Sequence, residues 1–588
     1  MPIVPVSRTI PTQSNPTLAT FKIFSEGEQL PDSIGVSLVA VTKNINKISS
    51  ARLVIHDGDL AEEDFFLSSG NMFLPGKEIE IKAGYNNLED TIFKGIIIRH
   101  GLEYKADQAS KLVLELKDKA IKMTVGRKNK YFFETTDSDI IEELIGSYGI
   151  DAEVEGTNTN HAEMVQYFIS DWDFLVSRAE VNGMLVFNDD GKITVKKPDF
   201  SIESQLNLVF GDNVLEFDGQ IDARDQFSNV TGKTWNFINQ EVNEKESEEP
   251  GFEEPGNISG RDLADVIGLA GFPLQHTGHI TDDELQNWSD AKLLRSRLSK
   301  IQGRLKIIGF ADIKPGSLIN LGGFGTRFNG KCYVSGVYHE MSTEIKWYTY
   351  LDIGLSQKTL FEQYDDVLDI PASGLVAPIR GLHQGIVTTI QDDPDGEGRV
   401  KVKIPLISLD EEGIWARLST LDAGEGERGT FFYPEVGDEV IVGFFNEDPR
   451  DPVILGKMHS SSKPTPLEPQ DDNFQKGIFT KGKSKLVFDD EVKSITLETE
   501  SENKIIISEE KGGVSIEDEN GNKITLNSDG ISLESAKDII LKASGDIKIE
   551  GMNVSAKADA EFKGEGGGGA ELSSSAMTVV KGSLVQIN

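Results

Sequence analysis

The C-terminal part of the chain decides the fold, and its central stretch, from Ser494 to Glu550, reads SITLETESENKIIISEEKGGVSIEDENGNKITLNSDGISLESAKDIILKASGDIKIE. Pairs of aliphatic residues, each split by one residue, recur along it, and Asn, Asp and Gly lie between the pairs. The pairs are Ile495/Leu497, Ile505/Ile507, Val514/Ile516, Ile524/Leu526, Ile531/Leu533, Ile539/Leu541 and Ile547/Ile549. Successive pairs begin 10, 9, 10, 7, 8 and 8 residues apart. This period of two predicts short strands separated by turns, each with one apolar face.

One copy of this stretch buries too little apolar surface to be stably folded by itself. Fourteen aliphatic side chains at ~1.5–3 kcal/mol each contribute roughly 20–40 kcal/mol. Ordering about 55 backbone residues at ~1–2 kcal/mol each costs more than that. Seven strands also make barely two turns of a one-chain solenoid, which needs about three repeats. We therefore predict an intertwined trimeric β-helix, a needle over residues 478–588, with these fourteen aliphatics as its core. A short monomeric solenoid is the alternative.

Composition excludes several classes of function. The 588 residues are enough for three or four domains, and the formal net charge is -38, from 97 Asp and Glu against 59 Lys and Arg. Nucleic acids and anionic membranes both attract clustered basic residues, so neither is an expected partner. The one cysteine, Cys332, permits no intrachain disulfide. We see no signal peptide and no apolar run long enough for a membrane helix, and we expect synthesis in the bacterial cytoplasm.

The first 365 residues read as strands with a few helices. Two helices are expected in an α/β part at 130–200, one after TDSD and one after the capping pattern Ser170-x-x-Asp173. A hairpin is expected at Asp190-Gly191. Residues 236–300 are expected to form an acidic loop followed by a helix that begins at Thr281 and ends at Gly303.

A compact β-rich block follows at 375–460, and residues 461–477, with three prolines in SSKPTPLEPQDD, read as a linker. Five or so short strands separated by Gly, Pro and Asp turns are typical of a small closed barrel. The fold class is thus mainly β and multidomain.

The barrel block resembles the OB-fold of the VgrG family, the spikes of type VI secretion systems and related contractile injection systems. The matching positions are Gly398–Val400, Trp415–Leu418, Ala423–Gly424, Pro434, Gly437–Val440 and Pro452–Gly456. DWDFLVSRAEVNGM, from Asp171 to Met184, resembles a helix in the phage-hub-like region of the family, and GSLVQIN resembles its C-terminal end.

The resemblance implies a homotrimer that punctures a target envelope. It implies a phage-hub-like region at 1–365 with two barrel-like subdomains, which docks on a hexameric inner-tube protein and baseplate proteins. It further implies a PAAR-type tip protein on the needle and effector cargo. A type VI system, an extracellular phage-tail-like particle and a phage all fit, and the particle would be delivered outside or into the target cell. A trimeric β-helical adhesin or tail-fibre-like protein and a spike-associated cell-wall hydrolase are the alternatives.

The last seven residues are the expected seat of the tip protein. They are Gly582, Ser583, Leu584, Val585, Gln586, Ile587 and Asn588. In a trimer the three aliphatics among them would form a small apolar patch that needs a cover. Simple closure of the column is the other interpretation.

No residue pattern predicts an enzyme, so no catalytic residue, cofactor or metal ligand is assigned. DDPDGEG at 392–398 lacks the closing Glu of a calcium loop and reads as a turn. His56–Asp59 and His339-Glu340 lack the spacing of zinc ligands. Asp171 and Asp173 could pair as carboxylates for glycoside hydrolysis, but the first turn of a helix explains them.

Overall fold

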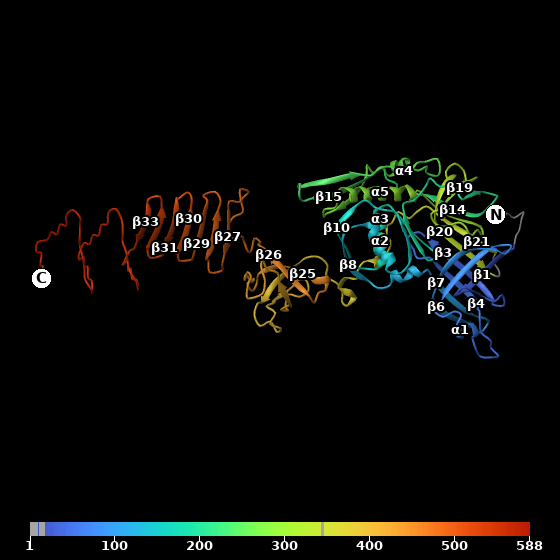
Figure 1. The fold of residues 1–588 in the computed structure, drawn as a ribbon, viewed down its shortest axis with the longest axis horizontal. Helices are drawn as coiled ribbons and strands as arrows, with labels where there is room; N and C mark the ends of the chain where they lie inside the picture. Colours follow the sequence, from blue (N-terminus) through green and yellow to red (C-terminus); the bar gives the residue numbers. More distant parts are fainter. Residues whose placement is uncertain (1–9, 11–17, 343–345, 588) are drawn as a thin grey trace. The chain divides into compact units, whose positions relative to one another are not determined.

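The protein is described here from a computed structural model, which covers residue 10 and residues 18–342 and 346–587. The chain divides into two compact units, Met1–Arg380 with Asn446–Pro449, and Gly381–Phe445 with Arg450–Asn588. Strands dominate both units, which confirms the predicted mainly β, multidomain fold (Figure 1). Among the described residues, no helix has the length and apolarity to cross a membrane.

The first unit is organised by one sheet of thirteen strands. They are β1 (Ala19–Ser25), β2 (Glu28–Gln29), β3 (Val36–Asn44), β4 (Ser50–His56), β5 (Glu78–Tyr85), β6 (Leu88–Lys105), β7 (Gln108–Lys117), β13 (Leu206–Val209), β14 (Val214–Ile221), β18 (Ile301–Ile308), β19 (Leu318–Gly322), β20 (Gly330–Ser342) and β21 (Tyr348–Ile353). Strand β3 pairs with β20, so segments far apart in the chain become neighbours. The described strands join in one continuous sheet with two buried clusters, and the expected two barrel-like subdomains stay a prediction.

An α/β part lies between the two halves in sequence. Its elements are β8 (Lys128–Thr136), α2 (Asp137–Gly146), β9 (Asp151–Val154), β10 (Asn160–Ile169), α3 (Asp171–Val181), β11 (Leu185–Asp189) and β12 (Lys192–Lys196). Thr136 caps α2 and Ser170 caps α3, each accepting a hydrogen bond from a backbone N–H of the first turn. The hairpin expected at Asp190-Gly191 is present, and both residues have positive φ, as a type I′ turn requires.

The segment predicted as an acidic loop plus a helix contains more structure. It holds β15 (Val230–Asn236), β16 (Glu241–Glu246), α4 (Gly260–Ile267), β17 (Phe272–His276) and α5 (Asp282–Ser299). The loop prediction was wrong for Glu241–Glu246, because β16 pairs with β15 and places Val242 opposite Trp235. Two further short α-helices are α1 (Phe66–Ser69) and α6 (Leu360–Gln363).

The predicted end of α5 at Gly303 was also wrong. Thr281 caps the helix as expected, but the helix ends at Ser299, and Gly303 lies inside β18. A Cβ atom at Gly303 would lie 2.5 Å from the carbonyl oxygen of Asp218 on the neighbouring strand. This glycine therefore permits a close strand contact and does not terminate the helix.

The second unit begins with a closed five-stranded barrel, as predicted. Its strands are β22 (His383–Thr389), β23 (Val400–Lys403), β24 (Ile414–Leu418), β25 (Glu439–Phe444) and β26 (Pro452–Lys457). The aliphatic side chains that alternate along these strands meet inside the barrel, where Val400, Val402 and Ile454 are fully buried.

Seven further strands form a sheet in which every strand pairs antiparallel with the next one along the chain. They are β27 (Gln475–Phe479), β28 (Lys485–Asp489), β29 (Ser494–Glu498), β30 (Lys504–Ser508), β31 (Gly513–Glu517), β32 (Lys523–Asn527) and β33 (Gly530–Glu534). The first begins inside the predicted linker, which is correspondingly shorter. Figure 1 shows these strands as successive rungs, followed by a strand-free chain.

Candidate functional site

One face of the seven-stranded sheet carries the aliphatic pairs that the sequence singled out. The register brings them together, because Ile495 lies opposite Ile507 and Leu497 opposite Ile505. The same alignment continues from strand to strand as far as Ile524 opposite Leu533. Two columns of aliphatic side chains therefore run across the sheet, and we call them the apolar face. It consists of Ile495, Leu497, Ile505, Ile507, Val514, Ile516, Ile524, Leu526, Ile531 and Leu533.

The apolar face is not covered by its own chain. Nine of its ten side chains are 36% to 75% exposed, and Val514 is half-buried. Monomeric soluble proteins rarely expose a contiguous apolar patch of this kind, so it indicates a surface that another body covers. The face is the candidate functional site of the chain.

The apolar face also extends one strand further than the sequence indicated. Leu486 lies opposite Leu497, and Phe488 lies opposite Ile495. Both residues stand on β28 with one residue between them, so the same pattern of alternation could have identified them.

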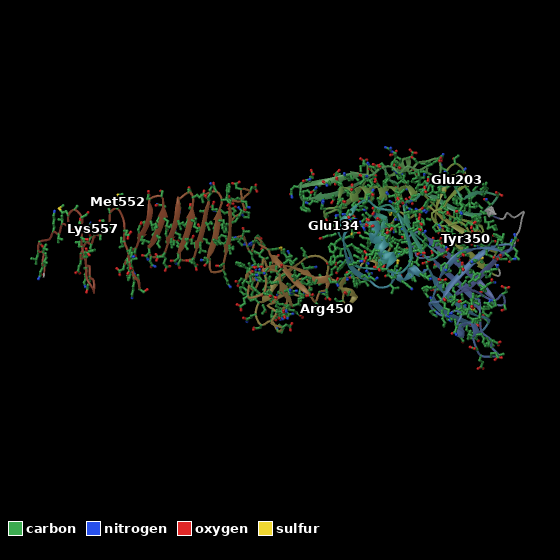
Figure 2. All side chains as sticks on the ribbon, in the orientation of Figure 1. Glu134, Glu203, Tyr350, Arg450, Met552 and Lys557 are labelled. Atoms are coloured by element: carbon green, nitrogen blue, oxygen red, sulfur yellow. The ribbon has the colours of Figure 1, made fainter. Side chains whose placement is uncertain are left out.

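The remaining two predicted pairs are not brought into the sheet. Ile539, Leu541, Ile547 and Ile549 lie in residues 535–587, where the described chain forms no strand. Their side chains are 54% to 70% exposed. Figure 2 shows Met552 and Lys557 in this segment projecting from the chain.

The opposite face of the sheet is mostly polar, with Val487 and Ile506 as aliphatic exceptions, and it carries a row of alternating charges. Cross-strand register aligns Lys485, Glu498, Lys504, Glu517, Lys523 and Glu534 in that order. Lys485 lies 3.1 Å from Glu498, and Glu517 lies 3.2 Å from Lys504 and 2.9 Å from Lys523. Hydrogen bonds from Lys523 and Lys504 lower the pKa of Glu517. We call this row the charge ladder, and it marks the polar face as the one that meets water.

The expected tip seat is exposed and, over its described residues, forms neither a strand nor a helix. Leu584 and Ile587 are 82% and 90% exposed, Val585 is half-exposed, and Gly582, Ser583 and Gln586 are likewise exposed outside any strand. Asn588 lies outside the described residues.

The residues weighed as possible catalytic or metal groups have structural partners. Asp171 accepts hydrogen bonds from Gln166, Lys128 and Tyr148 at 2.6 to 2.7 Å. Burial raises the pKa of Asp171, but these hydrogen bonds outweigh burial and lower it. Asp173 accepts a hydrogen bond from Ser170. Both carboxylates thus stabilise the start of α3.

The histidine-containing candidates are similarly occupied. His339 is buried, and burial lowers its pKa to about 3, so it is neutral at physiological pH. Its Nδ1 lies 3.0 Å from the Thr349 hydroxyl. The Asp57 carboxylate of the His56–Asp59 segment accepts hydrogen bonds from the backbone N–H groups of Leu67 and Ser68. Asp393 of the 392–398 turn pairs with Arg399. Within the described ranges, no three His, Cys, Asp or Glu side chains are grouped to hold a metal.

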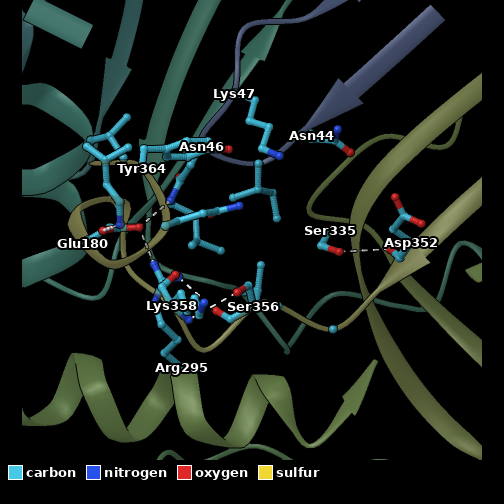
Figure 3. Close-up of a pocket in the computed structure, with 17 residues that line it drawn as sticks. Asn44, Asn46, Lys47, Glu180, Arg295, Ser335, Asp352, Ser356, Lys358 and Tyr364 are labelled. Atoms are coloured by element: carbon cyan, nitrogen blue, oxygen red, sulfur yellow. Dashed lines mark hydrogen bonds and ion pairs between the residues drawn. The ribbon is translucent and has the colours of Figure 1, made fainter. Parts of the chain in front are cut away.

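A cavity of about 200 Å³ lies in the first unit between the sheet and α3, α5 and α6 (Figure 3). Its central charged group is Glu180, which accepts hydrogen bonds from Arg295 at 2.6 Å and from Asn46 at 3.1 Å. The same carboxylate accepts the backbone N–H of Leu360. Glu180 therefore joins four segments of the unit, and the cavity is a packing junction around that carboxylate.

Comparison with protein families assigns the three parts of the chain separately. The Alg8 N-terminal domain matches residues 15–343, more than half of the chain. The type VI secretion system/phage-baseplate injector OB domain matches residues 383–459, which include the closed barrel. The phage baseplate V C-terminal trimerisation domain matches residues 494–560, which include most of the apolar face.

Individual relatives are similar over shorter stretches. The type VI secretion system spike protein VgrG3 of Vibrio cholerae is 32% identical over 109 residues, 17% of this chain and 11% of that protein. The spike protein VgrG1b of Pseudomonas aeruginosa is 26% identical over 212 residues, 33% of this chain. This chain covers 28% of the length of VgrG1b, so it spans less than a third of either relative.

Among solved structures, a 43 kDa tail protein of prophage MuSo2 from Shewanella oneidensis is similar with 12% identity and a TM-score of 0.42. The likeness covers 57% of this chain and 98% of that chain. A TM-score below 0.5 is too low to support an assignment.

Proposed function

The chain belongs to the family of the Alg8 N-terminal domain and is a VgrG-family spike protein, and from this we propose that three copies of it form the spike of a contractile injection system. The observation that carries the proposal is the apolar face. An exposed stripe of aliphatic side chains along a sheet is expected to pack against another apolar surface that excludes water. Identical copies of the chain provide apolar surfaces of matching length. The match of residues 494–560 to a trimerisation domain supports three copies.

The parts of the chain suggest different roles in the spike. The first unit would join the spike to the hexameric inner-tube protein and the baseplate, and the C-terminal sheet would form the needle that punctures the target envelope. The chain would act mechanically, without a catalytic centre of its own. It would be made in the bacterial cytoplasm and leave the cell as part of the particle.

The needle's end would carry a PAAR-type tip protein, and effector cargo would travel with that tip. Leu584, Val585 and Ile587 support this role because they are exposed aliphatics close together in sequence. Deletion of residues 582–588 is expected to abolish binding of the tip protein in a pull-down while the trimer stays intact. Retained binding would contradict this seat.

The mass of the full chain in solution tests the proposal. Light scattering on the purified protein is expected to give three times the 64.6 kDa of one chain. A stable single chain would contradict the spike, because one copy leaves the apolar face in water. A trimer that cleaves peptidoglycan would instead favour a cell-wall hydrolase.

A further inference from the structure

A short segment of the first unit lies on the α/β part after β21 ends. It comprises residues 358–368, which we call the strap, and it contains α6 and the 3₁₀ turn η2 (Asp365–Val367). Of its eleven side chains only Leu360 and Val367 are buried, and both belong to the hydrophobic core of the α/β part. Two buried aliphatic side chains are few for a segment of this length, so polar contacts have to contribute to its attachment.

The near end of the strap is attached through its backbone. Arg295 donates a hydrogen bond to the carbonyl oxygen of Lys358 at 2.9 Å (Figure 3). Glu180 accepts the backbone N–H of Leu360 at 2.9 Å. Both contacts belong to the group around the Glu180 carboxylate, so this end of the strap is part of the packing junction.

The far end of the strap is attached to one side chain, Arg127. Its guanidinium donates hydrogen bonds to the carbonyl oxygens of Asp366, Val367 and Leu368, at 2.5 to 3.0 Å. Carbonyl groups at the end of a helical turn lack partners inside it. A guanidinium presents five N–H donors in a fixed plane, so it can bind several such oxygens at once.

A fourth acceptor of Arg127 has a strained backbone. Arg127 also donates to the carbonyl oxygen of Phe168 at 2.9 Å. Phe168 has φ of +44°, which is unfavourable for a bulky side chain, and it lies where the register of β10 shifts between Gln166 and Ile169. Asn129 accepts the backbone N–H of Phe168 at 2.8 Å. Strain of this kind persists only where the surroundings hold it, and it is typical of clamps and switch regions.

The contacts of Arg127 lie where the chain leaves the α/β part for the barrel. Leu368 and Ile370 are 59% and 60% exposed, and no described residue from 369 to 382 belongs to the core of the α/β part. The first barrel strand begins at His383. A load that acts along this connecting segment therefore reaches Arg127 before it reaches Leu360 and α6.

We propose that Arg127 is a load-bearing clamp, which keeps the strap on the α/β part when force acts along the connection to the barrel. One guanidinium holds three consecutive carbonyl groups of the strap, so these contacts share the load and break together. Without the clamp, the strap detaches as one segment while the α/β part stays folded. The purpose of the clamp rests on the proposed function, because a spike driven through an envelope transmits force along its chains.

Hydrogen exchange on the full-length protein tests the clamp. In Arg127→Gln the backbone amides of residues 360–368 are expected to exchange about tenfold faster than in the unchanged protein, while those of α2 and α3 keep their rates. Unchanged exchange in the strap would overturn the clamp. Equal acceleration in α2 and α3 would also overturn it, because Arg127 would then stabilise the α/β part as a whole.

Two further variants sharpen this test. Arg99→Gln is the matched control, because Arg99 is exposed on β6 and pairs with Glu115 at 3.0 Å, and no change in the strap is expected from it. Arg127→Lys keeps the charge but loses the planar set of donors, so intermediate exchange is expected. Exchange in Arg127→Lys as slow as in the unchanged protein would contradict the shared hold on three carbonyl groups.

A pulling experiment tests the load directly. Cysteines at the exposed positions Glu142, on α2, and Glu397, in the barrel, carry the handles, in trimers with one labelled copy. Cys332 does not compete, because burial raises the pKa of its thiol to about 12. Detachment of the eleven-residue strap lengthens the chain by up to about 40 Å, and in Arg127→Gln this step is expected at lower force.

The failures of the two proposals are distinguishable. The same detachment force with and without Arg127 would overturn the clamp and leave the spike untouched. A mass other than that of a trimer would contradict the proposed function, whereas the exchange of the strap is measured within each chain.

Discussion

The closed barrel and the seven-stranded sheet have strands of similar length and sequence pattern, but only the barrel buries its aliphatic side chains. Both use strands of four to seven residues in which Val, Ile or Leu alternates with polar residues. In the barrel the sheet closes, and Val400, Val402 and Ile454 are fully buried. In the sheet the strands follow one another without closing, and Ile507 remains 49% exposed.

The difference lies in the connections. The sheet pairs each strand only with its sequence neighbours, and its two end strands never meet. In the barrel, β22 pairs with β25 and β24 pairs with β26, so contacts between distant segments close the ring. The alternation of apolar and polar residues thus predicts which side chains are buried, whereas the strand pairing determines whether the same chain can bury them.

The largest expected effect separates the two faces of one strand. Ile507→Lys places three charges on the apolar faces of a trimer, where an unpaired buried charge costs several kcal/mol per copy. We expect the trimer to dissociate, as measured by light scattering. Ile506→Lys is the matched control, because Ile506 faces Thr496 and Ser515 on the polar side. Equal dissociation of both variants would break the assignment of faces.

A smaller effect distinguishes burial within a chain from burial between chains. Ile454→Ala in the barrel and Ile524→Ala in the sheet each remove a similar side chain, at a cost of about 2–5 kcal/mol where the site is buried. The midpoint of the barrel's thermal transition is expected to fall by the same amount at every protein concentration. The midpoint for the sheet variant is expected to rise with concentration, because association stabilises it. Calorimetry at two concentrations would show a concentration-independent shift for both if the sheet buried its own face.

The smallest effect concerns the charge ladder. Lys504→Glu places like charges beside Glu498 and Glu517, at a cost of about 0.2–1 kcal/mol for each exposed pair, and salt reduces that cost. Lys511→Glu, in a turn, is the control.

The charge ladder also predicts a pH dependence of stability. Since Lys523 and Lys504 hold the pKa of Glu517 below its usual value, the stabilisation from these ion pairs is present above about pH 4.5 and is lost as the pH falls below it. Thermal melts from pH 7 to pH 3, at low and high salt, measure both effects.

Local signals in the sequence predicted local structure well. Ser170 and Thr281 cap helices as predicted, and Asp190-Gly191 turns a hairpin, because these residues act through backbone groups a few positions away. The end of α5 was predicted wrongly because Gly303 is needed for a close contact with the backbone of Asp218, and only the sheet brings these two residues together. The pairing of β16 with β15 likewise depends on tertiary context.

The candidate site was predictable only in part. The spacing of the aliphatic pairs selected the ten residues that the register aligns on the apolar face, but it also selected four residues outside the sheet and missed Leu486 and Phe488. That these residues form the core of a needle stays a prediction. Whether neighbouring strands belong to one chain or to three depends on the conformation of the turns. Lys493 and Glu502 have positive φ, although Lys and Glu are not residue types from which a left-handed turn would be predicted.

The meander of β27–β33 also sets an order of events in time. Neighbouring strands are separated by only a few residues, so each hairpin can close within microseconds while the chain is still alone. In the proposed trimer, the apolar face is covered only after three chains have met, a step whose rate depends on how many copies are present. Synthesis from one messenger, with nascent chains side by side, would therefore shorten the interval during which an aliphatic surface is open to aggregation.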